Sequence, residues 1–174
     1  MSALAAELKE LMLRAPRLTL AVAESVTAGQ VQARVAAVAG ASGFFLGGVT
    51  AYALEQKVKL LGVGRKHAAE VNCVSARVAE EMARGVCALF DADLGVATTG
   101  YAEPIGLAQG GALAADGVAE PMAWWAVARR GARGKFSVRH GRVECPGASR
   151  AEAQAIVAEA ALAELVAWVR AGRG

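Results

Sequence analysis

The sequence has few cysteines, no export signal and no long hydrophobic run, and each absence excludes a class of protein. Its three cysteines, Cys73, Cys87 and Cys145, are odd in number and form no Cys-x-x-Cys spacing. Neither a disulfide framework nor a zinc site is therefore indicated. We expect a protein of a reducing compartment that holds no metal and no other cofactor.

A leader peptide and a membrane helix are not predicted either. The first residues carry no cationic start, and Glu7, Lys9 and Glu10 interrupt the apolar residues that follow. The longer apolar stretches are broken by glycine and hydroxyl residues before they reach the roughly 20 predominantly apolar residues that a crossing helix needs. We expect a soluble, cytoplasmic protein that is not exported and has no membrane partner.

What is present is the composition of a compact domain. Hydrophobic residues, many of them alanine and valine, make up 55% of the 174 residues, and charged residues make up 20%. This balance is typical of a globular chain and not of a disordered one. The length fits one domain, residues 1–174, which can bury about two-thirds of the surface that its unfolded chain exposes.

Positive charge is concentrated in one segment near the C-terminal third. The net charge is only +3, but the segment 129–142 contains no acidic residue and holds these basic ones: Arg129, Arg130, Arg133, Lys135, Arg139, His140 and Arg142. One interpretation is a β-hairpin, residues 124–129 with 135–143, whose charges protect an edge strand from aggregation. The others are capture of a phosphorylated small molecule or of nucleic acid. Nucleic acid is disfavoured, because Phe136 is the one aromatic side chain in the segment that could stack on a base.

The order of hydrophobic patterns predicts an α/β protein. Helical spacing or capping signals indicate helices at residues 3–14, 27–38, 55–61, 75–89 and 149–170, and apolar runs indicate strands at 18–23, 49–53 and 94–99 before the late hairpin. This alternation predicts a three-layer α/β/α sandwich with a mainly parallel, mixed sheet. Ligands are then expected at the carboxyl ends of the strands. The Gly/Ala-rich segment 105–119 is expected to be a variable loop.

The turn from the first strand into the second helix carries the most specific signal. Ser25 lies directly after the strand, and Thr27-x-x-Gln30 has the form of a capping box. Unpaired N–H groups in the first turn of a helix stabilise negative charge, so Ser25 is placed near a potential oxyanion or phosphate site. The same residue types also occur in such turns for capping alone.

Three strand ends are expected to bring polar residues to one edge of the sheet. They carry Ser25, Tyr52 and Thr99, and Lys57 follows one turn into the next helix. A lysine whose pKa is lowered by burial can activate a serine without a histidine, which would make Ser25 and Lys57 a catalytic pair. Alternatively, Lys57 is an ordinary exposed lysine. His67 is expected in a solvent-facing loop, so a histidine triad is not predicted.

Several motifs in one order resemble the C-terminal domain of the competence/damage-inducible protein CinA. They are AESVTAG, GASGFFLGGVTAYALEQKVKLLGV, VSARVAEEMA and ADLGVATTGYAEP, within residues 18–104, with weaker similarity at 120–127 and 146–150. The family includes stand-alone nicotinamide mononucleotide (NMN) deamidases, so the resemblance implies a metal-free amidohydrolase that converts this nucleotide to the acid and ammonia. It also implies assembly into a homo-oligomer.

Site residues follow from the resemblance, position by position. It implies that Ser25 is the nucleophile, that Lys57 is its base and that Tyr52 belongs to the same catalytic cluster. Substrate would be bound by Thr27, Gly29, Thr99, Gly100 and Arg150, of which Thr99 and Gly100 would line the pocket near the reacting carbonyl and Arg150 would meet the phosphate.

The chain also departs from the family pattern at positions near the expected site. Val26 and Ala28 replace a cysteine and a glycine, Leu54 replaces an asparagine, and Glu103 replaces a glycine in a segment that reads TGYAEP. A glutamate adds negative charge where an anionic nucleotide would bind. A second hypothesis is therefore a catalytically inactive relative that binds a nucleotide or a partner without turnover.

Overall fold

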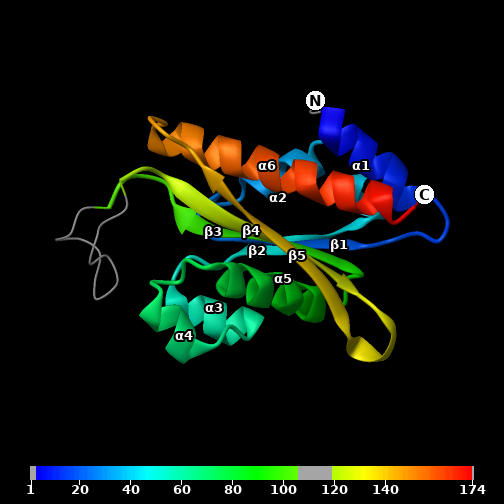
Figure 1. The fold of residues 1–174 in the computed structure, drawn as a ribbon. Helices are drawn as coiled ribbons and strands as arrows, with labels where there is room; N and C mark the ends of the chain where they lie inside the picture. The colour runs from blue at the N-terminus through cyan, green and yellow to red at the C-terminus, as the bar shows by residue number, and fades with distance from the viewer. Residues whose placement is uncertain (1–2, 106–118, 174) are drawn as a thin grey trace.

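A five-stranded mixed sheet forms the centre of the molecule (Figure 1). The computed structural model describes residues 3–105 and 119–173. The sheet order is β2-β1-β3-β4-β5, with strands β1 (Leu20–Glu24), β2 (Phe45–Thr50), β3 (Leu94–Tyr101), β4 (Met122–Arg130) and β5 (Phe136–Glu144). Strands β2, β1 and β3 are parallel, whereas β4 and β5 run antiparallel to their neighbours. The carboxyl ends of the first three strands therefore meet at one edge.

Helices cover both faces of this sheet, as Figure 1 shows. One face carries α1 (Ala3–Leu13), α2 (Gln30–Ala36) and α6 (Arg150–Ala171), and the other carries α3 (Leu54–Leu61), α4 (Arg65–Glu70) and α5 (Ala76–Phe90). The predicted α/β/α sandwich with a mixed sheet is confirmed. None of the helices in the described ranges combines the length and the apolar character needed to cross a membrane.

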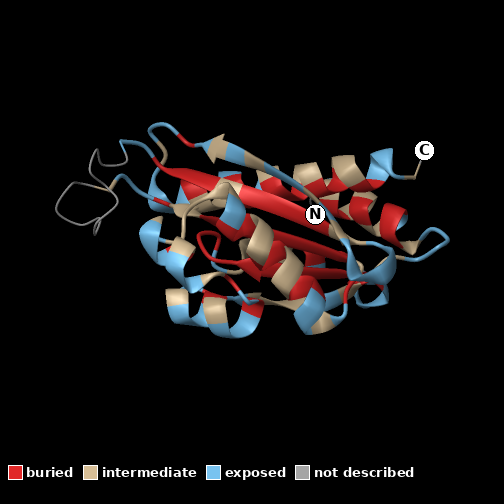
Figure 2. Cartoon of the chain, turned by 60° about the horizontal axis from the view of Figure 1, so that its bottom comes forward, coloured by how far each residue is buried: buried red, intermediate tan, exposed pale blue. Residues whose placement is uncertain are grey.

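The alternation of side chains along the strands explains the two halves of the core. Figure 2 shows the buried residues in red along the sheet and on the helices packed against it. In β1, Leu20 and Val22 face the cluster that includes α1, α2 and α6, whereas Ala21 and Ala23 face the cluster that includes α5. Small residues on the second face let α5 approach closely. At Gly95 a Cβ atom would lie 2.2 Å from the carbonyl oxygen of Ala83, so only glycine fits there.

Capping residues set the ends of several helices as predicted. The Ser75 hydroxyl accepts the N–H of Val78 at 3.2 Å and begins α5. Gly62, with φ of 66°, ends α3 in the left-handed conformation. At Ser149 a complete capping box with Glu152 begins α6.

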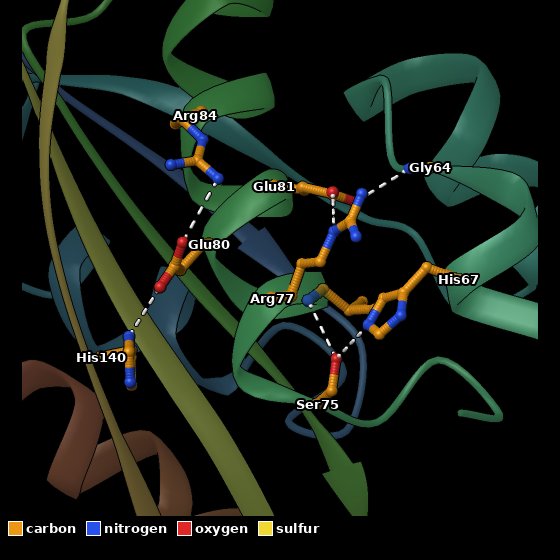
Figure 3. Close-up of polar contacts among 9 residues, drawn as sticks. Gly64, His67, Ser75, Arg77, Glu80, Glu81, Arg84 and His140 are labelled. Atoms are coloured by element: carbon orange, nitrogen blue, oxygen red, sulfur yellow. Dashed lines mark hydrogen bonds and ion pairs between the residues drawn. The ribbon is translucent and has the colours of Figure 1, made fainter. Parts of the chain in front are cut away.

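The segment around His67 differs from its prediction as a solvent-facing loop. Residues Arg65–Glu70 form the short helix α4, and His67 Nε2 lies 3.0 Å from the Ser75 hydroxyl (Figure 3). The helix lacks an apolar periodicity long enough to detect, because six residues make fewer than two turns. His67 thus helps to join α4 to the start of α5 and stays away from the predicted catalytic residues.

The basic segment 129–142 forms the predicted hairpin of β4 and β5. Four of its seven basic residues reach acidic partners: Arg130 pairs with Asp91, Arg139 with Glu164, His140 with Glu80 and Arg142 with Glu144. Figure 3 shows Glu80 held between His140 and Arg84. More than half of the basic residues of the hairpin therefore pair with acidic side chains of the same chain, which supports the edge-strand interpretation over nucleic-acid binding.

Candidate active site

A cavity of about 440 Å³ opens at the carboxyl ends of β1, β2 and β3. It lies where the parallel strand order predicted a ligand site. Six of its lining residues were predicted as site residues: Ser25, Tyr52, Lys57, Thr99, Gly100 and Arg150. The structure therefore brings together six of the eight residues proposed from the sequence.

Ser25 and Lys57 form the centre of this cavity. The Lys57 Nζ lies 2.9 Å from the Ser25 Oγ and donates a second hydrogen bond to the carbonyl oxygen of Tyr52 at 2.6 Å. Ser25 follows β1 directly, and Lys57 lies in the second turn of α3, which begins where the chain leaves β2. Parallel pairing of β1 with β2 thus brings residues 32 positions apart into hydrogen-bond contact.

The environment of Lys57 favours its neutral form. The side chain is 1% exposed, and burial lowers the pKa of its amine from the ordinary value of 10.5, an effect that the nearby Cys73 partly opposes. No carboxylate lies within ion-pair distance of the amine in the described part of the chain. A neutral amine within 2.9 Å of a hydroxyl can act as a general base toward it.

Cys73 is the other potential nucleophile in the cavity lining. Burial raises the pKa of its thiol, and only the charge of Lys57 acts in the opposite direction. A thiol with a raised pKa holds little thiolate at neutral pH. The chemistry of the site therefore favours the hydroxyl of Ser25 over the thiol of Cys73 as the attacking group.

The outer rim of the cavity holds a chain of three polar side chains. One nitrogen of the Arg150 guanidinium donates to Glu103 Oε1 at 2.9 Å, and another donates to the Tyr52 hydroxyl, also at 2.9 Å. Arg150 is the first residue of α6, so the helix on one face of the sheet reaches the turn after β2. Tyr52 contributes twice: its carbonyl holds Lys57 and its hydroxyl holds Arg150.

Thr27 and Gly29 were predicted to bind substrate, but neither lines the cavity. The Thr27 hydroxyl is fully buried and bonds to the carboxylate of Glu24 and to the hydroxyl of Thr98. The same carboxylate accepts the backbone N–H groups of Gly29, Val31 and Gln32. The first turn of α2 is thus already occupied by an internal anion.

This arrangement also corrects the predicted helix start. Helix α2 begins at Gln30 after Gly29, whose φ is 102°, and no Thr27 capping box forms. Glu24, at the end of β1, does the capping from outside the helix, since its two oxygens reach three N–H donors. The N-terminus of α2 is therefore not an oxyanion site for Ser25.

Replacing Glu24 with glutamine is expected to lower the free energy of unfolding by about 2–4 kcal/mol, because an NH₂ group would then face buried N–H donors. Urea denaturation followed by circular dichroism measures the change. Glu10→Gln, at an exposed position of α1, is the control that loses the same charge. Equal midpoints for the two variants would contradict the capping role of Glu24.

Thr99 and Gly100 line the cavity, but their local roles are partly structural. The Thr99 hydroxyl donates to the carbonyl oxygen of Cys73 at 2.7 Å. At Gly100 a Cβ atom would lie 2.4 Å from the carbonyl oxygen of Met122, so the close approach of β4 requires glycine there. Thr99 therefore holds the turn before α5 against β3 and is not a free donor for an oxyanion.

Several lining residues were missed because they come from the turn between α4 and α5. Asn72 and Cys73, with φ of 47° and 62°, adopt the left-handed conformation at the cavity wall. Asparagine tolerates this conformation well, whereas cysteine gives no sequence signal for it. Val74, Tyr101, Ala102 and Ile105 complete this side. Of the variable loop predicted at 105–119, residues 106–118 lie outside the described residues.

Within residues 3–105 and 119–173, no three His, Cys, Asp or Glu side chains gather closely enough to hold a metal ion. The three cysteines form no disulfide with one another. The polar side chains of the cavity are two aliphatic hydroxyls, an amine, a guanidinium, a carboxylate, a thiol and the side chains of Tyr52, Tyr101 and Asn72. This set fits acyl chemistry through serine better than metal-assisted chemistry.

Comparison with known proteins agrees with this architecture. The family described as "CinA C-terminal domain" matches residues 2–168. A CinA-like protein of Picosynechococcus is 45% identical over 93 residues, which are 53% of this chain and 22% of that protein. A CinA-like protein of Geobacter sulfurreducens is 46% identical over 95 residues, 55% of this chain and 23% of that protein. The matched stretch thus spans less than a quarter of these curated relatives.

Solved structures extend the similarity over nearly the whole chain. A CinA superfamily protein from Enterobacter cloacae superposes with a TM-score of 0.79 at 26% identity, covering 95% of this chain and 90% of the other. A competence/damage-inducible protein from Agrobacterium tumefaciens gives a TM-score of 0.78 at 26% identity, with 96% of each chain covered. The shared fold therefore includes the late hairpin and α6, where the sequence similarity is weaker.

Proposed function

This chain belongs to the CinA C-terminal domain family, and from that premise we propose that it is an amidohydrolase acting on a pyridine carboxamide of the NMN type. The observation that supports the proposal most directly is the 2.9 Å contact between the Ser25 hydroxyl and the buried amine of Lys57. A nucleophile within hydrogen-bond reach of a base is the basic requirement of covalent acyl transfer.

The first half of the proposed reaction releases ammonia. Neutral Lys57 takes the proton of the Ser25 hydroxyl while Oγ attacks the carboxamide carbon, and the carbonyl oxygen becomes an oxyanion. The Lys57 ammonium then gives its proton to the leaving nitrogen as the C–N bond breaks. Ammonia departs and an ester on Ser25 remains.

The second half consumes water. Lys57, neutral again, takes a proton from a water molecule that attacks the ester carbon. The Ser25 oxygen leaves and recovers its proton from Lys57, and the product is the carboxylic acid. The carbonyl of Tyr52 keeps one N–H of the amine engaged, so that the nitrogen stays directed at Ser25 through both halves.

The oxyanion needs a donor other than those predicted from the sequence. The N–H groups at the start of α2 are bound to Glu24, and the Thr99 hydroxyl is bound to Cys73. The backbone N–H of Val26 makes no hydrogen bond with another described residue, and Val26 lines the cavity directly after the nucleophile. We assign the oxyanion to this N–H, in line with the usual place of such donors.

The experiment that tests the proposal is direct. The purified chain is incubated with NMN and with its riboside, and ammonia and the acid product are both quantified. We expect equal amounts of the two products, formed without added metal and unaffected by a chelator. Absence of ammonia from both compounds at high enzyme concentration would refute the amidohydrolase proposal.

A second candidate is a protein that binds a nucleotide or a partner without turnover. One observation favours the loss of turnover: Arg150, the group expected to position a substrate through its phosphate, is held by Glu103 and Tyr52. In that case NMN should raise the melting temperature while no ammonia appears. Ammonia release that depends on Ser25 would exclude this candidate.

A further inference from the structure

Glu103 brings negative charge into the cavity, and the proposed reaction makes no use of it. Of the sixteen lining residues, three are of the lysine, arginine, aspartate and glutamate types, namely Lys57, Glu103 and Arg150. Lys57 lies in the interior and serves Ser25. Among the described residues, Arg150 and Glu103 therefore set the charge that an arriving substrate meets at the rim.

At the rim the positive charge of Arg150 is already compensated. One end of its guanidinium is bound to the Glu103 carboxylate and another to the Tyr52 hydroxyl. A phosphate that used the same two N–H groups of this guanidinium would have to displace both partners. It would also approach the Glu103 carboxylate, because Glu103 Oε1 lies 2.9 Å from the same guanidinium.

The cost of that approach is moderate because the rim is hydrated. Glu103 and Arg150 are 62% and 46% exposed, so solvent weakens both their attraction and the repulsion of a third charge. A phosphate dianion beside a carboxylate is nevertheless disfavoured, and like charges in a binding site are a standard source of discrimination. A cationic pyridinium ring without a phosphate suffers no such penalty and gains from the carboxylate.

We infer that Glu103 selects substrates by charge, so that this cavity takes carboxamides of neutral or cationic pyridine compounds without a phosphate in preference to phosphorylated ones. The preference in turnover rests on the proposed function, because it requires the amidohydrolase reaction. The preference in binding does not require that reaction. The preference depends on the contacts of Arg150 with Glu103 and Tyr52, whereas the reaction depends on the contact between Ser25 and Lys57.

The kinetic test compares NMN with its riboside, which differ by the phosphate. For the wild-type chain, kcat/KM should favour the riboside by roughly tenfold or more. Glu103→Gln keeps the size of the side chain and removes the charge, so it should raise kcat/KM for the mononucleotide about tenfold, through KM, and should lower or leave unchanged kcat/KM for the riboside. An unchanged ratio of the two substrates would overturn the inference.

A matched control separates this local effect from a change in net charge. Glu55 is an exposed glutamate that pairs with an arginine, Arg65, as Glu103 pairs with Arg150, but Glu55 does not line the cavity. Glu55→Gln should therefore leave the substrate ratio at its wild-type value. An equal shift in both glutamine variants would assign the preference to net charge and contradict the inference.

A binding test separates failure of this inference from failure of the proposed function. Dissociation constants of both compounds are measured by calorimetry on Ser25→Ala with and without Glu103→Gln, so that no turnover is needed. Tighter binding of the riboside that is lost with Glu103→Gln supports the inference even if wild type releases no ammonia. Equal affinities, or binding of neither compound, overturn it.

Discussion

Ser25→Ala should reduce the release of ammonia from a pyridine carboxamide by about 10³-fold or more, since it removes the one hydroxyl of the described residues that lies within bonding distance of Lys57. The loss should be in kcat, while the dissociation constant of the substrate changes little. Ammonia is quantified under single-turnover conditions, which also detect a slow residual reaction. Full activity in this variant would contradict covalent catalysis by Ser25.

Two comparisons keep the Ser25 result interpretable. Ser137→Ala changes an exposed serine on β5, outside the cavity, and should retain wild-type activity. Within the described residues, the Ser25 side chain makes one hydrogen bond, which is with Lys57. Loss of this bond should leave the melting temperature nearly unchanged. A large drop in melting temperature would mean that the loss of activity reflects misfolding.

Lys57→Met should lower kcat by about 10³-fold while it preserves or raises stability. Methionine fills the same buried space without an amine, and an uncompensated buried amine disfavours the folded state. Ammonia release and urea denaturation measure the two effects. Lys59→Met, on the exposed face of the same helix, is the control and should change neither quantity.

The pH dependence gives the Lys57 role a second signature. The folded-state pKa of Lys57 is lowered below 10.5, so the unfolded chain binds more protons between the two values. The free energy of unfolding of the wild-type chain should therefore rise with pH across that window, relative to Lys57→Met. As the pH rises through the lowered pKa of Lys57, kcat/KM should also rise, because the amine becomes neutral. A flat profile would contradict a general-base role.

The sequence was sufficient for the parts of the site that depend on strand order. Apolar runs ending at Ser25 and before Tyr52, together with Ser75 as the cap of α5, are local signals of element type and direction. Parallel strands then bring their ends together by a general rule. Burial of Lys57 was left undecided between two interpretations, because a helix of eight residues has no clear apolar face to place it.

What the sequence did not reveal are contacts made across the chain by single side chains. Glu24 was given no role from the sequence, yet it caps α2. The left-handed turn at Asn72 and Cys73 is stabilised from β3 by Thr99, 26 residues beyond Cys73. Likewise, the pairing of Glu103 with Arg150 joins positions 47 residues apart. Such contacts form only in the completed fold, and they produce no periodic pattern in the sequence.

The tryptophans and the proposed catalytic pair lie on different elements of the mixed sheet and its helices. All three tryptophans belong to the late part of the chain: Trp124 and Trp125 lie in β4 and Trp168 lies in α6. Ser25 and Lys57 instead depend on β1, β2 and α3. Indole fluorescence therefore follows the packing of β4 and α6 into a core that includes β1, whereas the proposed turnover also requires β2 and α3. A lag of turnover behind fluorescence during refolding would report the late docking of β2 and α3.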